Sequence, residues 1–153
     1  MKIGVISDTH GLLRPEALQA LAGVSHILHA GDVGDAAILD ALAQVAPLTA
    51  IRGNIDRSGP CAALPATELV ELGGTNFYLV HDVHDLDLDP VAASIGVVVS
   101  GHSHKLAAEW RKGVLYLNPG SAGPRRFSLP VTIALVSFDE GAPHAEIVPL
   151  LPR

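Results

Sequence analysis

The sequence predicts a mixed α/β fold in which two β-sheets pack face to face and helices lie outside them. In the first third of the chain, short β-branched runs alternate with helical patterns, as in parallel strands joined by right-handed crossovers. In the second half, apolar runs follow one another in hairpin-like pairs. Hydrophobic residues make up 48% of the 153 residues and aromatic residues only 4%, so we expect an aliphatic core.

The first half of the chain contains three expected strands and two expected helices. The strands are the apolar runs at residues 2–7, 26–30 and 48–52. The first helix covers residues 14–24, with Pro15 near its start and leucines at helical spacing. The second covers residues 35–45, where Asp35 is a suitable N-cap and Pro47 ends the pattern.

The second half is expected to be mostly antiparallel. Its expected strands lie at residues 67–72, 76–82, 95–101, 106–113, 114–120, 131–139 and 144–151. Gly73 and Gly74 separate the first pair, and Lys112-Gly113 separates a later pair, as in hairpins. The last two strands flank residues 140–143 and are expected to pair. No internal repeat or long linker interrupts the chain, so we expect one domain over residues 1–153.

Charge and composition argue against several classes of function. The formal net charge of −6 disfavours a general nucleic-acid surface. Cys61 is the single cysteine and cannot form an internal disulfide, which suits a reducing cytoplasm. The opening MKIGVISDTHG is too short an apolar run for a secretory signal, and no apolar run is long enough to span a bilayer. We therefore expect a cytoplasmic protein that does not cross a membrane.

Side chains able to bind metal follow five of the expected strands. These seven candidate ligands are Asp8, His10, Asp32, Asn54, His81, His102 and His104. Because ligands of open α/β sheets bind at the carboxyl ends of the strands, we expect these side chains to converge. Ordinary loop polarity explains each of them alone. Ordinary loop polarity is a much poorer explanation for five strands that each end in a possible metal ligand at the same edge of the sheets.

The chemistry of these side chains indicates which metals suit them. Carboxylates, an amide and imidazoles without a thiolate favour Mn²⁺, Fe or Zn²⁺ over Ca²⁺. Seven ligands are too many for one catalytic ion that keeps an open position, but they fit two ions if a carboxylate bridges. Two ions about 3.5–4 Å apart can clamp a displacement at phosphorus and lower the pKa of a shared water. We expect two divalent ions, Mn²⁺ first, with Fe, Zn²⁺ or Ni²⁺ as alternatives.

Together these motifs resemble those of the calcineurin-like metallophosphoesterases. They are D-x-H at 8–10, G-D-x-x-D at 31–35, G-N at 53–54, a lone histidine at 81 and G-H-x-H at 101–104. The closing NPGS at 118–121 and the small size resemble the compact YfcE-type phosphodiesterase branch. The resemblance implies a four-layer αββα sandwich that hydrolyses small phosphodiesters through attack by a metal-bridging hydroxide.

The resemblance also implies a role for each candidate ligand. It divides them into Asp8, His10 and His104 around one ion, Asn54, His81 and His102 around the other, and Asp32 as the bridge. Those closest to the reaction would be Asp32, Asn54, His81, His102 and His104.

Four further side chains lie near these motifs. Asp35 would either orient a ligand or cap its helix, and second-layer carboxylates of this kind fix imidazole tautomers. His29, shortly before Asp32, is expected to be structural or to support it. Arg125, with its neighbour Arg126, is a candidate contact for the substrate phosphate, with surface solubility as the alternative.

Two departures from the family pattern bear on the chemistry. Many members have G-N-H-[DE], in which the histidine helps the leaving group to depart, but here Ile55 takes that place. The general acid is then missing, or is supplied by Asp56, another histidine or water, which favours phosphodiesters with good leaving groups. The fourth motif reads HDVHD, where His81 directly ends its strand and His84 is the reserve.

Two alternative functions remain at this point. A retromer subunit resembles this fold and acts as a protein-binding scaffold with an altered metal site, whereas this chain keeps all seven candidate ligands. A nuclease is disfavoured by the acidic balance of the chain. The partners expected are therefore a small phosphodiester substrate and, from the family resemblance, further copies of the chain in a small homo-oligomer.

Overall fold

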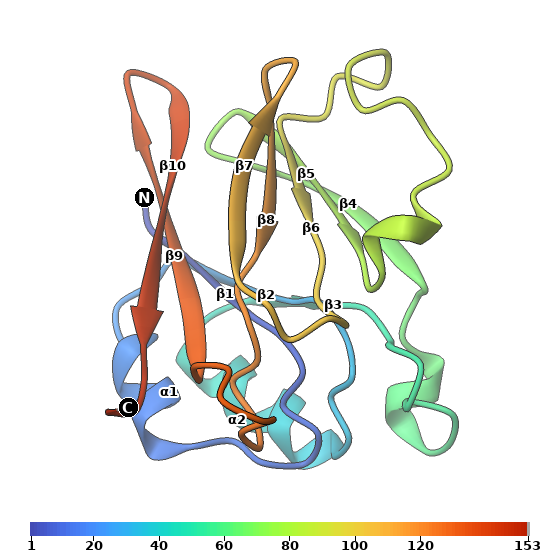
Figure 1. Cartoon of the computed structure of the whole chain (residues 1–153), viewed down its shortest axis with the longest axis vertical. Helices are drawn as coiled ribbons and strands as arrows, with labels where there is room; N and C mark the ends of the chain where they lie inside the picture. Colours follow the sequence, from blue (N-terminus) through green and yellow to red (C-terminus); the bar gives the residue numbers. More distant parts are fainter. Residues whose placement is uncertain (153) are drawn as a thin grey trace.

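The computed structural model describes residues 1–152 and places ten strands in two five-stranded sheets (Figure 1). The first sheet has the order β10 (Ala142–Pro149), β9 (Thr132–Asp139), β1 (Ile3–Ile6), β2 (His26–His29) and β3 (Leu48–Ala50). The second has the order β4 (Thr67–Leu72), β5 (Thr75–Val80), β6 (Val97–Val99), β8 (Val114–Asn118) and β7 (Ala107–Arg111).

The first sheet confirms the alternating start of the chain. Strands β1, β2 and β3 are parallel and are connected by α1 (Pro15–Ala20) and α2 (Ala36–Val45). Helix α1 ends earlier than predicted, with its C-cap at Leu21. The predicted pairing of the last two strands is also confirmed, and β9 adds antiparallel to β1. This addition makes the sheet mixed.

The second half of the chain is mostly antiparallel, as predicted, although its second sheet is mixed. The hairpins β4–β5 and β7–β8 form as expected, but β5 pairs parallel with β6, and β6 pairs parallel with β8. Parallel neighbours need a crossover connection. Residues 81–96 supply it between β5 and β6, and β7 lies at the edge so that β8 can reach β6. Half of the four pairings in this sheet are therefore parallel.

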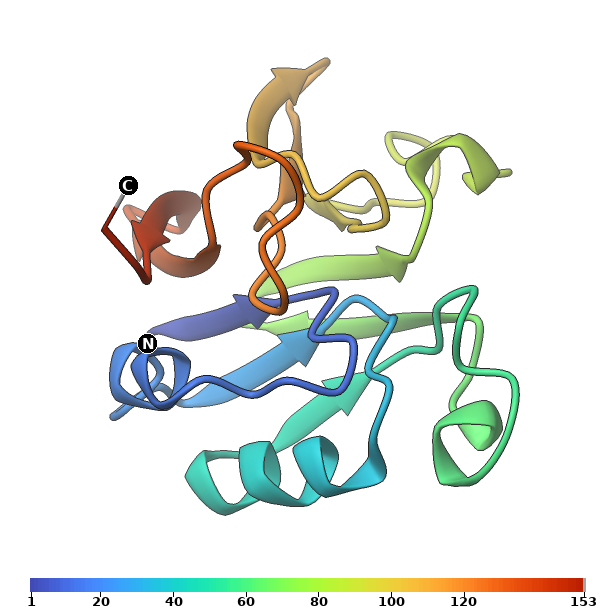
Figure 2. The same ribbon diagram turned by 60° about the horizontal axis from the view of Figure 1, so that its bottom comes forward.

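Three apolar clusters hold the layers together. The largest buried aromatic, Phe77, lies between the two sheets with aliphatic residues of both. A second cluster packs α1 and α2 on the outer face of the first sheet, and Figure 2 shows both helices on that side. On the outer face of the second sheet, Ile95 and Leu88 cover Val98, next to the short 3₁₀ helix η2 (Val83–Asp85). This arrangement confirms the predicted αββα sandwich.

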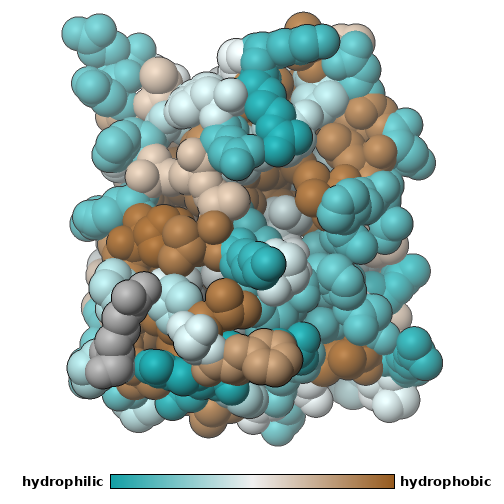
Figure 3. Space-filling model, in the orientation of Figure 1, coloured by the Kyte–Doolittle hydropathy of each residue, from teal (hydrophilic) through white to brown (hydrophobic). Residues whose placement is uncertain are grey.

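The surface carries hydrophobic side chains in separate groups between hydrophilic ones, as one face shows in Figure 3. Among the exposed apolar residues are Trp110 on the edge strand β7 and Phe127 in the loop before β9. Within residues 1–152 no helix has both the length and the apolar character needed to cross a membrane.

Candidate metal centre

The seven candidate ligands converge in the loops that follow the strands. Six of them follow the carboxyl ends of β1, β2, β5 and β6, and Asn54 lies in the segment after β3. Six of them form two groups in which the ligand atoms lie within 4.8 Å of one another: Asp8, His10 and His104, called the Asp8 group, and Asp32, His81 and His102, called the Asp32 group. The seventh, Asn54, joins the Asp32 group. Its Oδ1 atom lies 3.0 Å from Nε2 of His81 and 3.2 Å from Nδ1 of His102.

Asp32 belongs to the group named after it, but its side chain also faces the Asp8 group. Its Oδ2 atom is 3.2 Å from Nε2 of His81 and 3.4 Å from Nε2 of His10, which belongs to the Asp8 group. Its other oxygen, Oδ1, accepts a hydrogen bond from the backbone N–H of Ile55 at 3.0 Å. One oxygen is therefore fixed by the protein while the other faces histidines of both groups.

The Asp8 group fits a divalent cation. Among residues 1–152, three of its buried atoms have no hydrogen-bond partner: Oδ1 of Asp8, Nε2 of His10 and Nδ1 of His104. Buried polar atoms without a partner cost free energy, so such a cluster is unusual unless it binds a ligand. Imidazole and carboxylate donors together suit transition ions such as Mn²⁺, Fe and Zn²⁺.

The backbone at the centre is held in an uncommon conformation. Left-handed φ values between 47° and 71° occur at five of the candidate ligands: Asp8, His10, Asp32, His102 and His104. Aspartate tolerates this region better than most residues, as does histidine, and such conformations cluster at functional sites. The ligands therefore sit in tight loop turns and not within the strands.

Three of the ligands follow a glycine. Side chains of other ligands occupy the space where a Cβ atom on that glycine would lie. A Cβ atom on Gly53 would overlap the carboxylate of Asp32. A Cβ atom on Gly101 would lie 2.5 Å from Oδ2 of Asp8, and one on Gly31 would lie 2.7 Å from Nδ1 of His81. The dipeptides G-D, G-N and G-H thus allow loops from different strands to approach one another closely.

Hydrogen bonding orients the ring of His81. Its Nδ1 atom lies 2.7 Å from the carbonyl oxygen of Ala30 and can only donate there, so Nε2 faces Asp32 and Asn54. Burial lowers the pKa of His81, but the hydrogen bonds to Asp32 and Ala30 outweigh it and raise that pKa. Burial acts to raise the pKa of Asp32, yet hydrogen bonds from His81 and Ile55 bring it down to about 2. A carboxyl that stays ionised suits cation binding.

The buried side chain of His29 connects the loop after β1 to the loop after β2 through hydrogen bonds. Its Nδ1 accepts the backbone N–H of Gly31 at 3.1 Å, and its Nε2 lies 3.0 Å from the hydroxyl of Thr9. That hydroxyl donates to the carbonyl oxygen of Val33 at 2.9 Å, so it accepts from His29. Burial lowers the pKa of His29 to about 4, which keeps the ring neutral. Thr9 was recognisable in the sequence only by its place between the two ligands Asp8 and His10.

The NPGS stretch holds the ligand loops in place. Asn118 donates from Nδ2 to the carbonyl oxygen of Gly101 at 3.0 Å, and the hydroxyl of Ser121 donates to the carbonyl oxygen of Asp8 at 3.0 Å. In the sequence this stretch was informative only through the family resemblance, since both contacts join segments far apart in the chain.

Asp56 is not placed as a proton donor. Its two carboxylate oxygens accept hydrogen bonds from the backbone N–H groups of Val33, Gly34 and Gly53, at 3.1, 3.0 and 2.9 Å. The residue is only 4% exposed. Asp56 therefore ties the loop after β2 to the segment after β3, and both of its carboxylate oxygens are engaged in doing so.

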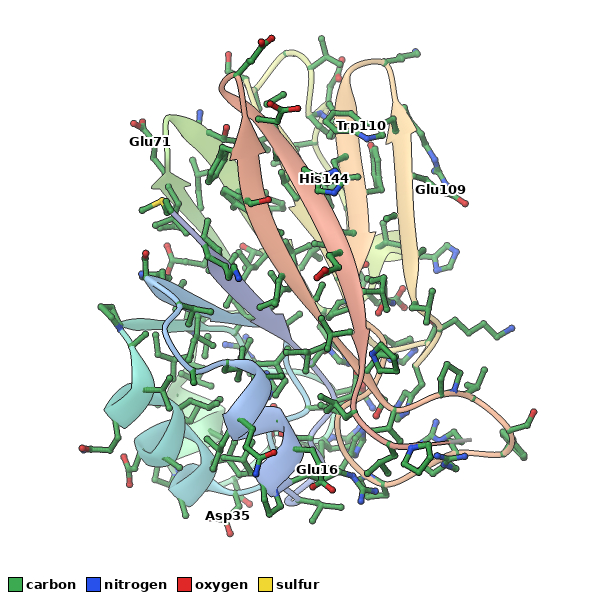
Figure 4. The ribbon with its side chains drawn as sticks, turned by 90° about the vertical axis from the view of Figure 1, so that its left-hand side faces the viewer. Glu16, Asp35, Glu71, Glu109, Trp110 and His144 are labelled. Atoms are coloured by element: carbon green, nitrogen blue, oxygen red, sulfur yellow. The ribbon has the colours of Figure 1, made fainter. Side chains whose placement is uncertain are left out.

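The remaining polar candidates lie around the centre. Asp35 caps α2 by accepting the N–H of Ala37 at 2.9 Å, and Figure 4 shows it at the start of that helix. His84 is 89% exposed in its side chain and bonds to Asp82, so the reserve histidine does not join either group. Arg125 donates to the carbonyl oxygen of Pro152 at 3.1 Å.

Two cavities adjoin the centre. A cavity of about 340 Å³ lies beside the Asp32 group and is lined by Arg52, Gly53, Asn54, Ala66, Thr67, Tyr78, Val80, His81, Asp82, Asp85, Asp87 and His102. A second cavity, of about 180 Å³, lies beside the Asp8 group and is lined by His10, His104, Pro124, Arg125 and Arg126. We call the first the wide cavity and the second the basic cavity. Arg125 thus lies next to the centre, as a substrate contact would require.

Solved structures with the same fold include an archaeal phosphodiesterase, with a TM-score of 0.79 and 23% identity, covering 97% of this chain and all of the other. YfcE, a phosphoesterase from E. coli, has a TM-score of 0.71 and 22% identity over 99% and 100% of the two chains. Vps29 from Entamoeba histolytica in complex with Zn²⁺ has a TM-score of 0.74 and 22% identity over 99% and 100%. These similarities show the fold.

The sequence itself shows the family. A probable metallophosphoesterase of Methanocaldococcus jannaschii is 32% identical over 163 aligned residues, covering 98% of this chain and 82% of the relative. A second, of Methanothermobacter thermautotrophicus, is 33% identical over 160, covering 97% and 92%. The profile of the calcineurin-like phosphoesterase superfamily domain matches residues 1–141. This chain therefore belongs to the calcineurin-like phosphoesterase superfamily.

Proposed function

We propose that the protein is a phosphodiesterase that hydrolyses small phosphodiesters with two divalent metal ions. The observation that carries this proposal is the position of Asp32. Its Oδ2 atom lies 3.4 Å from Nε2 of His10 and 3.2 Å from Nε2 of His81, one histidine from each group. A carboxylate oxygen between two clusters of nitrogen and oxygen donors is the arrangement that a bridged pair of ions requires.

Each side chain then has a defined task. The ion of the Asp8 group would be held by Asp8, His10 and His104, and the other by Asn54, His81 and His102, with Asp32 shared. Bound ions neutralise the charge of a phosphate and lower the pKa of a coordinated water. Asp8 is oriented for this task because its Oδ2 accepts from the hydroxyl of Ser7 at 2.7 Å and the N–H of His102 at 3.1 Å, so its Oδ1 faces the group.

The leaving group receives no proton from the position that carries a histidine in many relatives. Ile55 is 42% exposed there and has no proton to donate. Asp56 is engaged by three backbone N–H groups and is no substitute. The preferred substrates are therefore phosphodiesters whose departing alcohol is acidic. Mn²⁺ is the proposed ion because nitrogen and oxygen donors without a thiolate suit it, with Fe, Zn²⁺ and Ni²⁺ as alternatives.

A protein-binding scaffold is the second candidate, and the Vps29 similarity favours it. Vps29 from Entamoeba histolytica has been crystallised with Zn²⁺, so metal binding by this fold does not by itself separate the two functions. Completeness of the seven candidate ligands supports catalysis. The net charge of −6 counts against a nuclease. A cytoplasmic location and a homo-oligomer remain predictions of the sequence.

The test is a hydrolysis screen in which metal and substrate are varied separately. Protein stripped with a chelator is supplied with Mn²⁺, Fe²⁺, Zn²⁺ or Ni²⁺ and assayed with bis(p-nitrophenyl) phosphate and with p-nitrophenyl phosphate. We expect metal-dependent hydrolysis, fastest with Mn²⁺ and faster for the diester. Asp32→Asn is the matched control, since it keeps the size of the side chain but not its charge. Hydrolysis no faster than that of Asp32→Asn, with every ion, would support the scaffold instead.

A further inference from the structure

The two cavities beside the metal centre differ in charge. The wide cavity has three carboxylates on its wall, Asp82, Asp85 and Asp87, against the single guanidinium of Arg52. The basic cavity has two guanidinium groups, Arg125 and Arg126, and no carboxylate in its lining. Among the ion pairs within residues 1–152, none joins Arg125 or Arg126 to a carboxylate. On a protein with a net charge of −6, this is a local region of the opposite sign.

The cavities also differ in size. The wide cavity, at about 340 Å³, is within the range of about 300–1,000 Å³ in which small-molecule ligands bind. The basic cavity, at about 180 Å³, is below that range and accommodates only a compact group. A phosphodiester bound at the metal centre has two ester arms. The sizes therefore assign the bulkier arm to the wide cavity and the smaller arm to the basic cavity.

The segment that carries the arginines is anchored to the Asp8 loop. Ser121 donates to the carbonyl oxygen of Asp8, and the N–H of Ala122 donates to the carbonyl oxygen of Ser7 at 3.0 Å. Arg14 adds hydrogen bonds to the carbonyl oxygen of Gly123. In Figure 1 the orange segment before β9 accordingly lies beside the blue loop that follows β1. The backbone that carries Arg125 and Arg126 is therefore held in place next to His10 and His104.

We infer that the basic cavity is a subsite for a second anionic group, a phosphate or a carboxylate, carried by the smaller arm of the substrate. Arg126 and Arg125 recognise this group, while the phosphodiester itself lies at the metal centre. The inference rests on the proposed function and narrows it to diesters with one bulky arm and one short anionic arm. The acidic wall of the wide cavity adds to the selection, because it repels the same anionic group from the other side.

The test compares substrates that share one leaving group and carry either a neutral or an anionic small arm. These are p-nitrophenyl propyl phosphate, p-nitrophenyl 2-carboxyethyl phosphate and p-nitrophenyl 2-phosphonoethyl phosphate. In the unmodified protein, kcat/KM should be roughly ten- to a hundredfold higher for an anionic arm than for the propyl arm, as expected for a charge-assisted hydrogen bond. Comparison of the carboxylate with the phosphonate then identifies which anion is preferred.

Substitutions locate the effect. Arg126→Gln should bring the ratio of kcat/KM between anionic and propyl arms close to one. Arg126→Lys should keep part of the preference through its charge. Arg111→Gln is the control, because Arg111 is an exposed arginine paired with Glu109 on β7 and lines neither cavity.

The outcomes separate this inference from the proposed function. If the propyl ester is hydrolysed but the unmodified protein shows no preference for an anionic arm, the inference is wrong and the proposed function stands. The inference is equally wrong if Arg126→Gln keeps the full preference. If none of the three esters is hydrolysed with any of the four metals, the proposed function fails and the inference fails with it.

Discussion

The Nε2 atom of His81 lies 3.2 Å from Oδ2 of Asp32, and the two side chains come from opposite sheets of the sandwich. His81 follows β5 of the second sheet, and Asp32 follows β2 of the first. The carbonyl oxygen of Ala30 fixes the ring of His81 in this position. The candidate metal centre therefore spans the junction of the two sheets, and its geometry depends on how they pack.

Removal of His81 should change the number of bound ions. In His81→Ala the Asp32 group loses a central nitrogen donor, while the Asp8 group keeps all of its ligands. We expect two ions per chain in the unmodified protein and one in the variant, measured by elemental analysis after reconstitution. His84→Ala is the matched control, since its side chain is exposed and joins neither group. One ion in the unmodified protein at saturating metal would rule out the two-metal proposal.

Asp32 and Asp35 should respond differently to alanine substitution, although both belong to the G-D-x-x-D motif. Asp32→Ala removes the carboxylate shared by both groups and should reduce kcat far beyond the ten- to hundredfold typical of residues that only support ligands. Asp35→Ala removes a helix cap, which should cost about 1 kcal/mol of stability with little change in kcat. Denaturant unfolding and steady-state kinetics of both variants check this. Equal kcat values would contradict the role given to Asp32.

Gly53→Ala should weaken metal binding without removing a ligand. A Cβ atom there would overlap the carboxylate of Asp32, so Asp32 must move. We expect a loss of roughly ten- to a hundredfold in metal affinity, as for other changes that displace a ligand. Gly74→Ala is the control: its φ of 80° makes the substitution strained, but nothing lies within 4 Å. It should lower stability and leave the metal affinity, measured by calorimetry, unchanged.

His29 should make the stability of the metal-free protein depend on pH. Burial lowers its pKa in the folded state to about 4, whereas the unfolded chain has the usual value of 6.5. Between these two pH values, His29 binds a proton in the unfolded state but not in the folded state. The stability that the neutral His29 ring contributes is therefore fully present above pH 6.5 and is lost as the pH falls toward about 4. The contribution to the slope approaches about 1.4 kcal/mol per pH unit.

The measurement is the free energy of unfolding between pH 7 and pH 4.5 in chelator. His29→Gln should flatten the slope, because glutamine does not titrate there. His144→Gln, which replaces an exposed histidine on β10, should leave the slope as it is. Identical slopes in the two variants would mean that His29 is not the group that titrates.

Ile55 should make the rate depend strongly on the leaving group. General acid help is typically worth 10²–10⁴-fold, and none comes from this position. The rate should therefore fall steeply as the pKa of the departing alcohol rises. Ile55→His should flatten this dependence by accelerating esters with poor leaving groups selectively. A series of phosphodiesters of graded leaving-group pKa, with metal content checked in both proteins, gives the two slopes. A shallow slope in the unmodified protein would reveal another proton donor.

Local features of this protein were predictable from the sequence because neighbouring residues determine them. Helix α2 begins where the N-cap at Asp35 indicates, and the glycines at 73 and 74 turn the chain between β4 and β5. The seven candidate ligands could be recognised because each follows a run of apolar residues, and strands that end at one rim bring their following residues together. Spacing along the chain was sufficient for these predictions.

Tertiary structure alone decided the direction of β6 and β8, the role of Asp56 and the charge of the two cavities. An apolar run looks the same in a parallel as in an antiparallel pair, so the crossover at residues 81–96 was not visible in the pattern. Asp56 resembles a proton donor in the sequence, but its oxygens are engaged by N–H groups of distant loops. Such properties depend on which segments come into contact after folding. The sequence of one segment does not show which distant segment it will contact.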